Sequence, residues 1–201
     1  MEDIYVFDMG KVIKHSFDKP MFYSMIEAKI GFDDFDEYFE AFNLITEIGE
    51  ISSDQFLQKI LNYSLSTKSL DEAKLIYNDC SGSLYKDTMD ILHTLKDDGK
   101  KIYLLSNMKE IDFQCFKKKL DINMFDDLFL SFELKYRKSN LKIFQIMINK
   151  LKVNPQNIYF FDDLPINIKN AKSLGINSYL VTGDTILETW NKIYKTQDIG
   201  R

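Results

Sequence analysis

The chain opens on a short apolar run that ends in an aspartate, Ile4-Tyr5-Val6-Phe7-Asp8-Met9-Gly10-Lys11-Val12. Four consecutive apolar residues, two of them aromatic and two β-branched, leave neither face of the run polar. Such a run is typical of a strand that is buried on both faces of a parallel sheet. The polar residues that follow at once predict that this strand ends at Asp8.

Runs of the same kind recur along the chain, at Ile102–Leu105, Leu128–Leu130, Ile158–Phe161 and Ser178–Val181. Helical periods separate them, and Gly99, Pro165 and Gly175 stand at expected helix boundaries. Alternating strands and helices predict an α/β fold, a Rossmann-like doubly wound parallel sheet with helices on both faces.

Residues 16–82 break this alternation, because every periodic stretch in them is helical. Two capping boxes, Ser52 with Gln55 and Ser69 with Glu72, predict the starts of two of these helices. We therefore expect an inserted all-helical cap at 16–82 and an α/β core formed by 1–15 and 83–201.

Polar residues follow three of the expected strands directly. Asp8 follows the first, Ser106-Asn107 the second and Asp162-Asp163 a later one. Each alone could be a helix cap. Together they predict one site, since ligands bind beyond the carboxyl ends of the strands in open α/β sheets. Clustered carboxylates repel one another unless a cation lies among them, and oxygen ligands of this kind suit Mg²⁺.

The composition excludes several classes of partner. The 201 residues carry a net charge of −5, and only Arg137 and Arg201 among the 26 basic residues are arginines. The one dense basic run, Lys117-Lys118-Lys119, is expected on a solvated helix face, so we expect no nucleic-acid partner. No apolar run approaches the ~20 residues of a membrane span, so we expect no membrane partner.

The cysteines and the N-terminal run indicate a cytoplasmic protein. Cys80 and Cys115 match no metal-binding spacing and are expected to be buried, unpaired thiols. The N-terminal run lacks the basic stretch and the long apolar segment of a secretory signal. The oligomeric state stays open between monomer and homodimer.

Four ordered motifs resemble those of the haloacid dehalogenase (HAD) superfamily of hydrolases with a helical cap. They are Phe7-Asp8-Met9-Gly10-Lys11-Val12-Ile13, Leu104-Leu105-Ser106-Asn107, Tyr136-Arg137-Lys138, and Phe160-Phe161-Asp162-Asp163-Leu164-Pro165-Ile166-Asn167-Ile168. The cap run Gly49-Glu50-Ile51-Ser52 also resembles one found in many members. Within the superfamily the chain is similar to alpha-glucose-1-phosphatase-like phosphatases and to the N-terminal phosphatase domain of soluble epoxide hydrolase.

This resemblance implies a Mg²⁺-dependent phosphatase that acts on a small phosphorylated metabolite, for example a sugar phosphate. It implies that Asp8 is the nucleophile, which forms an aspartyl-phosphate that water then hydrolyses. It also implies that Asp8, the carbonyl of Gly10 and Asp163 hold the Mg²⁺.

The remaining roles implied by the resemblance concern the phosphate and its surroundings. Ser106 and the backbone of Asn107 would hold phosphate oxygens, and Lys138 would neutralise charge on the nucleophile and the phosphate. Asp162 would orient Lys138 or support the metal. Asn167 stands four residues after Asp163, where many members carry a second acid.

Two positions depart from the family pattern. Many HAD phosphatases have an aspartate at the position of Gly10, where it acts as general acid and base, a contribution of about 10²–10⁴ in rate. The usual Pro-Glu after the motif lysine is Ser139-Asn140 here. Lys135 and Lys142 are therefore competitors for the role of Lys138.

Two other functions stay open. A 2-haloacid dehalogenase would use an aspartate nucleophile without a metal, but paired acids such as Asp162-Asp163 would then repel each other and an anionic substrate. A catalytically weak HAD protein would bind a phosphorylated ligand or a partner without turnover. The sequence identifies neither the substrate nor the role of His15.

Overall fold

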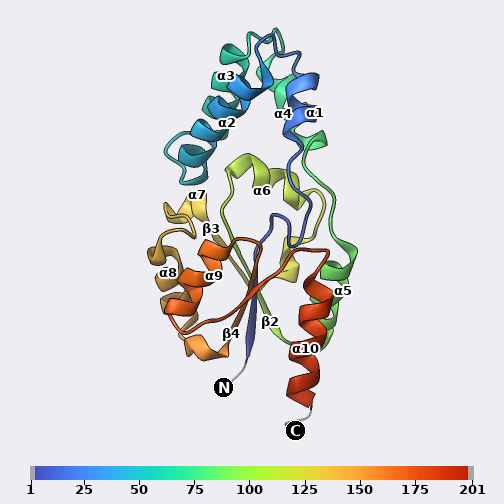
Figure 1. Cartoon of the computed structure of the whole chain (residues 1–201), viewed down its shortest axis with the longest axis vertical. Helices are drawn as coiled ribbons and strands as arrows, with labels where there is room; N and C mark the ends of the chain where they lie inside the picture. The colour runs from blue at the N-terminus through green and yellow to red at the C-terminus, as the bar shows by residue number, and fades with distance from the viewer. Residues whose placement is uncertain (1–2, 199–201) are drawn as a thin grey trace.

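The computed structural model describes residues 3–198, and its centre is a parallel five-stranded sheet in the order β3-β2-β1-β4-β5 (Figure 1). The strands are β1 (Ile4–Phe7), β2 (Lys101–Ser106), β3 (Asp127–Leu130), β4 (Ile158–Asp162) and β5 (Asn177–Leu180). Phe7 of β1 lies in register with Leu104 on one side and with Phe161 on the other. All five expected strands and the doubly wound α/β fold are thus confirmed.

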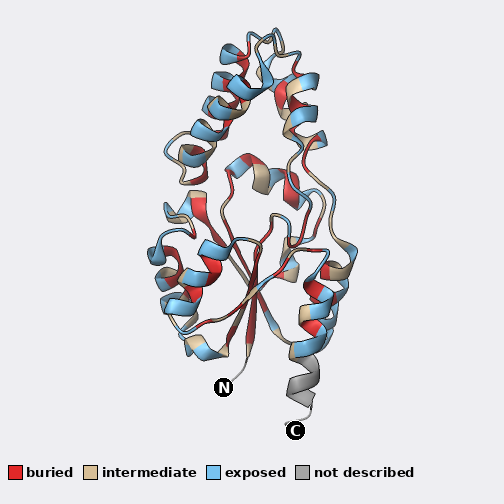
Figure 2. Cartoon of the chain, viewed as in Figure 1, coloured by how far each residue is buried: buried red, intermediate tan, exposed pale blue. Residues whose placement is uncertain are grey.

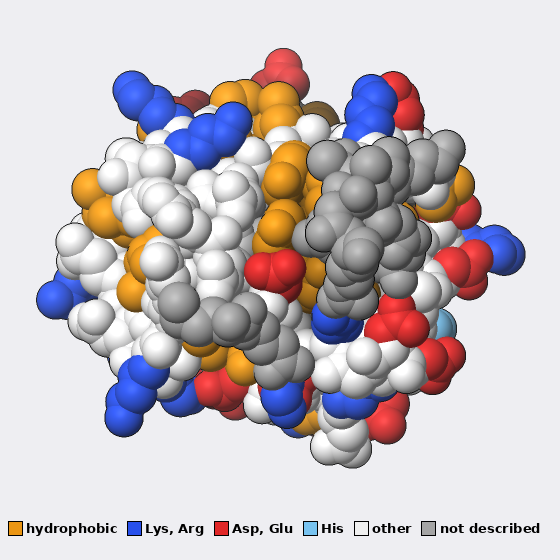
Figure 3. Space-filling view, turned by 90° about the horizontal axis from the view of Figure 1, so that it is seen from below, with side chains coloured by type: hydrophobic (Ala, Val, Ile, Leu, Met, Phe, Trp, Pro, Cys, Tyr) orange, Lys and Arg blue, Asp and Glu red, His pale blue; other side chains and the backbone are white. Residues whose placement is uncertain are grey.

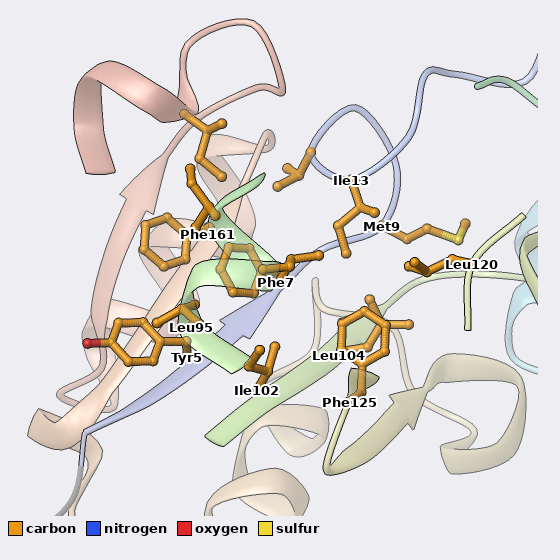
Figure 4. Packing of buried hydrophobic residues seen from close by; sticks show 14 of the residues in the cluster. Tyr5, Phe7, Met9, Ile13, Leu95, Ile102, Leu104, Leu120, Phe125 and Phe161 are labelled. Carbon is orange, nitrogen blue, oxygen red and sulfur yellow. The ribbon is translucent and has the colours of Figure 1, made fainter. Parts of the chain in front are cut away.

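Alternate side chains of β1 bury themselves in two different layers. Tyr5 and Phe7 point toward α5 (Lys86–Asp97) and α10 (Ile186–Asp198), whereas Ile4 and Val6 point toward α8 (Leu141–Leu151) and α9 (Pro165–Ser173). Figure 4 shows Phe7 beside Phe161 and Leu95 in the first layer, where the two phenyl rings stack with centroids 4.9 Å apart. Each fully buried Phe contributes about 1.5–3 kcal/mol to folding, and both layers fix the sheet from which the site residues project.

Four helices between β1 and α5 form a separate apolar cluster beyond one end of the sheet (Figures 1 and 2). They are α1 (Lys19–Met25), α2 (Phe32–Glu47), α3 (Ser53–Tyr63) and α4 (Leu70–Asp79). The capping boxes at Ser52 and Ser69 are both formed, as the sequence predicts. The cluster also contains Ile111 and Cys115 of α6 (Glu110–Lys117), so these helices rest on the sheet-containing part of the chain.

The two chain segments that lead into and out of the four helices run beside each other. Phe17 forms an antiparallel bridge with Ser81, and Lys14 forms one with Leu84. The approach is so close that a Cβ atom on Gly82 would lie 2.7 Å from the carbonyl carbon of His15. This position therefore needs glycine, because any side chain would push the two segments apart.

One expectation about the lysine run needs correction. Lys117 and Lys118 are exposed, but Lys119 is half-buried and its Nζ donates to the carbonyls of Ser81 and Gly82. These two hydrogen bonds hold the third lysine against the segment that leads out of the four helices. Cys80 and Cys115 are both buried and unpaired, as expected.

The helices and one face of the molecule can be compared with what the composition predicts about partners. Within residues 3–198, no helix combines the length and the apolar character that crossing a bilayer requires. Figure 3 shows the end of the molecule opposite α1–α4, where the described acidic and basic side chains are dispersed rather than gathered by sign.

One short α-helix and two 3₁₀ turns complete the description of the architecture. The segment α7 (Ser131–Leu134) follows β3 and ends at Lys135, which adopts a left-handed φ of 64°. Two 3₁₀ turns, η1 (Ile122–Met124) and η2 (Pro155–Asn157), precede β3 and β4. The loop after α7 returns toward the carboxyl ends of the strands and so carries Lys138 to the site.

Candidate active site

The carboxyl ends of β1, β2 and β4 meet beneath a cavity of about 480 Å³. Asp8 follows β1 directly, and Asp162 and Asp163 stand at the end of β4. One oxygen of each of these three carboxylates lies within 4.8 Å of the others. The opposite wall of the cavity comes from helices α2 and α4, through residues that include Phe39, Asn43, Glu47 and Tyr77.

Lys138 lies buried between two of the carboxylates. Its Nζ is 2.6 Å from Asp8 Oδ1 and 2.6 Å from Asp162 Oδ2, and the residue is only 1% exposed. Burial alone would lower the pKa of Lys138, but the negative charges of Asp8 and Asp162 outweigh it and raise that pKa. The ammonium group therefore stays charged at neutral pH.

The loop that carries Lys138 is held by asparagine side chains in place of the missing proline. Asn107 Oδ1 accepts a hydrogen bond from the backbone N–H of Lys138 at 2.8 Å, and Asn170 Nδ2 donates to the carbonyls of Lys138 and Ser139 at 3.0 Å. Asn140 caps α8 by accepting from the backbone of Lys142. Of the three lysines that the sequence leaves in competition, Lys138 reaches the carboxylates, whereas Lys135 and Lys142 are exposed.

Asp8 has one carboxylate oxygen engaged and one available. Oδ1 accepts from the backbone N–H of Met9 at 2.7 Å and contacts Lys138, while Oδ2 has no hydrogen bond from the side chains that the structure describes, those of residues 3–193. Burial raises the pKa of Asp8 to about 7, because Lys138 only partly offsets the burial and the charges of Asp162 and Asp163 add to it. Burial likewise raises the pKa of Asp163, with a further contribution from Asp162.

Asp162 is saturated by protein donors. It accepts from Lys138, from the backbone N–H of Leu164 at 2.8 Å and from Asn167 Nδ2 at 2.9 and 3.1 Å. Asn167 is therefore directed at Asp162, and the asparagine supplies a donor where an acid would add repulsion. This leaves Asp8 Oδ2 and Asp163 as the carboxylates available to a ligand, and Asp163 Oδ2 lies 3.6 Å from Nζ of the exposed Lys11.

These free groups fit a hard divalent cation. Burial, with a smaller contribution from the neighbouring carboxylates, raises the pKa of both Asp8 and Asp163, so a cation beside them would stabilise their charged forms. Carboxylate and carbonyl oxygens are the ligands that Mg²⁺ prefers. Gly10 lines the same cavity, and a Cβ atom there would meet nothing within 4 Å.

Of the two residues that the sequence predicts to hold phosphate oxygens, Ser106 and Asn107, only one lines the cavity. Asn107 lines the cavity, whereas Ser106 is buried at the end of β2 with its Oγ 3.5 Å from the carbonyl of Asn107. Ser106 is therefore behind the cavity wall in this conformation. His15 is exposed, and its ring lies against Tyr85 with centroids 3.8 Å apart.

Several charged residues of the cavity have no counterpart in the sequence prediction. Arg137 is half-buried, and its Nε donates to Glu47 at 2.7 Å. Lys14 and Lys109 are each 4% exposed and line the same cavity. Arg137 has a sequence signal in its position next to Lys138. Lys14 and Lys109 have none, because their burial depends on how the four helices lie over the sheet.

Comparison with known proteins supports a common ancestry for most of the chain. A family model described as a haloacid dehalogenase-like hydrolase matches residues 13–175. Drimenol cyclase of Aspergillus calidoustus is 28% identical over 141 residues, which make up 67% of this chain and 26% of that protein. The chain thus spans about a quarter of the length of this curated relative.

Solved structures resemble the chain over nearly its whole length. A HAD family enzyme of Bacteroides thetaiotaomicron, in complex with magnesium and inorganic phosphate, has a TM-score of 0.78 at 25% identity, covering 91% of this chain and 96% of that one. A predicted HAD-like hydrolase of Porphyromonas gingivalis has a TM-score of 0.74 at 23% identity, covering 91% and 92%. L-2-haloacid dehalogenase of Xanthobacter autotrophicus, with chloropropionic acid covalently bound, has a TM-score of 0.61 at 18% identity, covering 89% and 76%. The last two likenesses concern the fold alone.

Proposed function

The chain belongs to the haloacid dehalogenase-like hydrolase family, and on this premise we propose that it is a Mg²⁺-dependent phosphatase of small phosphorylated metabolites, such as sugar phosphates. The observation that carries the proposal is the contact of Asp8 with Lys138 beside two further carboxylates, under a cavity of metabolite size. The magnesium and phosphate bound by the Bacteroides thetaiotaomicron enzyme support it.

Asp8 is the proposed nucleophile. Its carboxylate oxygen attacks phosphorus, an O–P bond forms, and the bond from phosphorus to the leaving oxygen breaks. Water then attacks the phosphorus of the aspartyl-phosphate, which releases inorganic phosphate and restores the carboxylate. Because Gly10 provides no acid, the leaving oxygen takes its proton from solvent, and good leaving groups such as anomeric phosphates are favoured.

Positive charge around the phosphoryl oxygens is the main catalytic requirement of such a reaction. Lys138 supplies a fixed positive charge beside Asp8, and it is kept there by the hydrogen bonds that it donates to Asp162 and to the side-chain oxygen of Asn107. Asp8, the Gly10 carbonyl and Asp163 would hold Mg²⁺, which when bound adds charge neutralisation at the phosphate. The backbone of Asn107, with Ser106 behind it, would hold phosphate oxygens.

We also propose that residues 16–82 act as a cap over a core of residues 1–15 and 83–201. The cavity lies between Asp8 on one side and Phe39, Asn43 and Tyr77 on the other, so a bound molecule would contact both parts. Closure of the cap would exclude water and select the leaving group.

The carboxylate cluster favours a phosphatase over a 2-haloacid dehalogenase. A metal-independent dehalogenase would have to bind an anionic acid beside Asp8, Asp162 and Asp163, whose oxygens lie within 4.8 Å of one another. A weak HAD protein that only binds a phosphorylated ligand would have no use for the free oxygen of Asp8.

Phosphate release from a panel of sugar and nucleotide phosphates tests the proposed function. The panel is run with Mg²⁺, with EDTA, and with Asp8→Asn; Asp97→Asn, an exposed site in α5, is the matched control. We expect release that needs both Mg²⁺ and Asp8 and that survives in Asp97→Asn. Release that persists in EDTA, or in Asp8→Asn, would reject the mechanism.

A further inference from the structure

The cavity above Asp8 is rich in lysine and arginine, and nearly all of these side chains are already paired. Five of them have a carboxylate oxygen within 2.6 to 3.6 Å: Lys11 with Asp163, Lys19 with Glu40, Lys109 with Asp112, Arg137 with Glu47, and Lys138 with Asp8. The charges of these pairs balance within the protein, so they do not by themselves call for a further anion.

Lys14 is the exception among the cavity-lining cations. It is only 4% exposed, and among residues 3–193, whose side chains the structure describes, no carboxylate lies within ion-pairing distance of its Nζ. Its single side-chain hydrogen bond goes to the carbonyl of His15 at 3.2 Å. A buried ammonium group has three N–H donors and is costly to leave without a counter-charge. The Lys14 ammonium group is therefore available to bind a ligand.

The backbone fixes Lys14 close to the reacting group. Its N–H donates to the carbonyl of Met9 at 2.9 Å, and its carbonyl accepts from Lys11 at 2.7 Å. Lys14 is thus part of the tight loop that begins at Asp8, and it lines the same cavity as Asp8. A phosphoryl group on Asp8 and a second group on Lys14 can therefore belong to one small molecule.

The surroundings of Lys14 make a neutral ligand a poor match. Burial lowers the pKa of Lys14, the carboxylate of Asp112 partly restores it, and the neighbouring charges of Lys119 and Lys109 lower it again. Asp112 is itself occupied by Lys109 at 3.1 Å and by the hydroxyl of Tyr77 at 2.7 Å. An anionic group from a ligand would supply the missing counter-charge.

We propose that the substrate carries a second anionic group, a carboxylate or a second phosphate, on the part that leaves, and that Lys14 binds this group. The inference rests on the proposed phosphatase function and narrows its substrate class to phosphate esters with two anionic ends. Lys14 is a specificity-determining residue, since it contacts the leaving group rather than the phosphoryl group in transfer.

Two matched pairs of phosphate esters test this assignment and distinguish the two anions. 3-Phosphoglycerate and glycerol 3-phosphate differ only in a carboxylate against a hydroxymethyl group. Fructose 1,6-bisphosphate and fructose 6-phosphate differ in a second phosphate. In each pair, the anionic member is the ester with the second anionic group, and the neutral member is the ester that has an uncharged group in its place. The readout is the ratio of kcat/KM for the anionic member to that for the neutral member. It is measured for the wild-type protein, for Lys14→Met and for the control Lys169→Met, an exposed site on α9.

We expect the wild-type protein to favour the anionic member of at least one pair. Lys14→Met should lower that ratio about 10- to 100-fold, mainly through KM, because a hydrogen bond between charged groups is lost. Lys169→Met should retain the ratio. An unchanged ratio in Lys14→Met, an equal loss in Lys169→Met, or no preference in either pair would overturn the inference.

Calorimetric binding of the same four probes to Asp8→Asn separates this inference from the proposed function. Binding needs no turnover, so the preference for the anionic member and its loss in the Asp8→Asn, Lys14→Met double variant are measured even if no probe is hydrolysed. Failure of the phosphatase mechanism appears as activity that does not depend on Asp8. Failure of the Lys14 assignment appears as equal binding of anionic and neutral probes, or as binding of none.

Discussion

Lys138 balances the charge of the site, because it alone contacts both Asp8 and the fully buried Asp162. Replacing it with methionine keeps the length of the side chain and removes the charge. We expect Lys138→Met to lower the free energy of unfolding by about 3–5 kcal/mol, the usual cost of breaking a buried ion pair. Urea denaturation in EDTA measures this, with Lys169→Met as the exposed control.

Magnesium should restore part of the free energy of unfolding that Lys138→Met loses. A divalent cation bound by Asp8 and Asp163 would neutralise the charge that Lys138 no longer balances. The stabilisation by Mg²⁺ should therefore be larger in Lys138→Met than in the wild-type protein. Equal stabilisation of the two proteins would show that the cation does not bind beside these carboxylates.

Gly10 is the residue at which a gain of activity can be tested. A Cβ atom at this position meets nothing within 4 Å, and its φ is not positive, so a side chain fits without moving the backbone. An aspartate here would stand two residues after Asp8, where it can protonate the leaving oxygen. We expect Gly10→Asp to raise kcat for esters with poor leaving groups by about 10-fold or more.

The control for this prediction is Gly10→Asn, which has the same shape and no acid. It should leave kcat for poor leaving groups near the wild-type value. Equal rates for Gly10→Asp and Gly10→Asn would mean that proton supply does not limit the reaction.

At the scale of elements, the turn between α2 and α3 joins the helical block to the rest of the chain. Gly49 has a φ of +66°, and a Cβ atom there would lie 2.5 Å from the carbonyl oxygen of Phe132 in α7. Ser131 Oγ donates to the carbonyl of Glu47 at 2.6 Å, and Lys135 Nζ donates to that of Gly49 at 3.2 Å. The turn is thus docked closely on the segment that leads to Lys138.

Substitution of Gly49 tests this docking. Gly49→Ala adds backbone strain and a steric overlap, and we expect it to lower the free energy of unfolding by about 2–4 kcal/mol. Gly99→Ala is the matched control, since Gly99 has a φ of +68° but an open space around it; strain alone should cost about 1–2 kcal/mol there. Chemical denaturation of both variants gives the comparison, and equal losses would contradict close docking.

The elements that could be predicted are those specified by local sequence. Short runs that are apolar on both faces, such as Ile158–Phe161, identify buried strands. A helix of only four residues would not bury all of these side chains. Capping boxes such as Ser52 with Gln55 identify helix starts because the hydrogen bonds are local. The meeting of Asp8 with Asp162 and Asp163 follows from the parallel topology, which places all strand ends on one edge.

The rest depends on tertiary contacts that no local pattern encodes. Lys14 resembles any loop lysine in the sequence, and its burial depends on distant parts of the chain, since its charged neighbours include Asp112 and Lys119. Arg137 is drawn inward by Glu47, a residue 90 positions earlier in the chain. Lys138 is positioned by Asn107 and Asn170 rather than by the proline that the family pattern would provide.

At the scale of the whole molecule, the cavity lies between two parts that are covalently connected through two adjacent segments, near Phe17 and Ser81. A ligand that contacts both parts adds interactions across the cavity and should suppress their separation. We expect Mg²⁺ together with inorganic phosphate to slow amide hydrogen exchange at residues 14–17 and 81–84 severalfold. Exchange at these residues that is unaffected by both ligands would argue against closure of residues 16–82 over the site.

The most direct test of the central claim, that Asp8 is the nucleophile, is a search for the covalent intermediate. The full chain is mixed with Mg²⁺ and a phosphate ester that the release assay identifies, quenched in acid within one turnover, and analysed by peptide mass spectrometry. We expect one added phosphoryl group on the peptide that contains Asp8, and no such addition in Asp8→Asn or in EDTA. Turnover without any phosphorylated peptide, or phosphorylation at another residue, would contradict the mechanism.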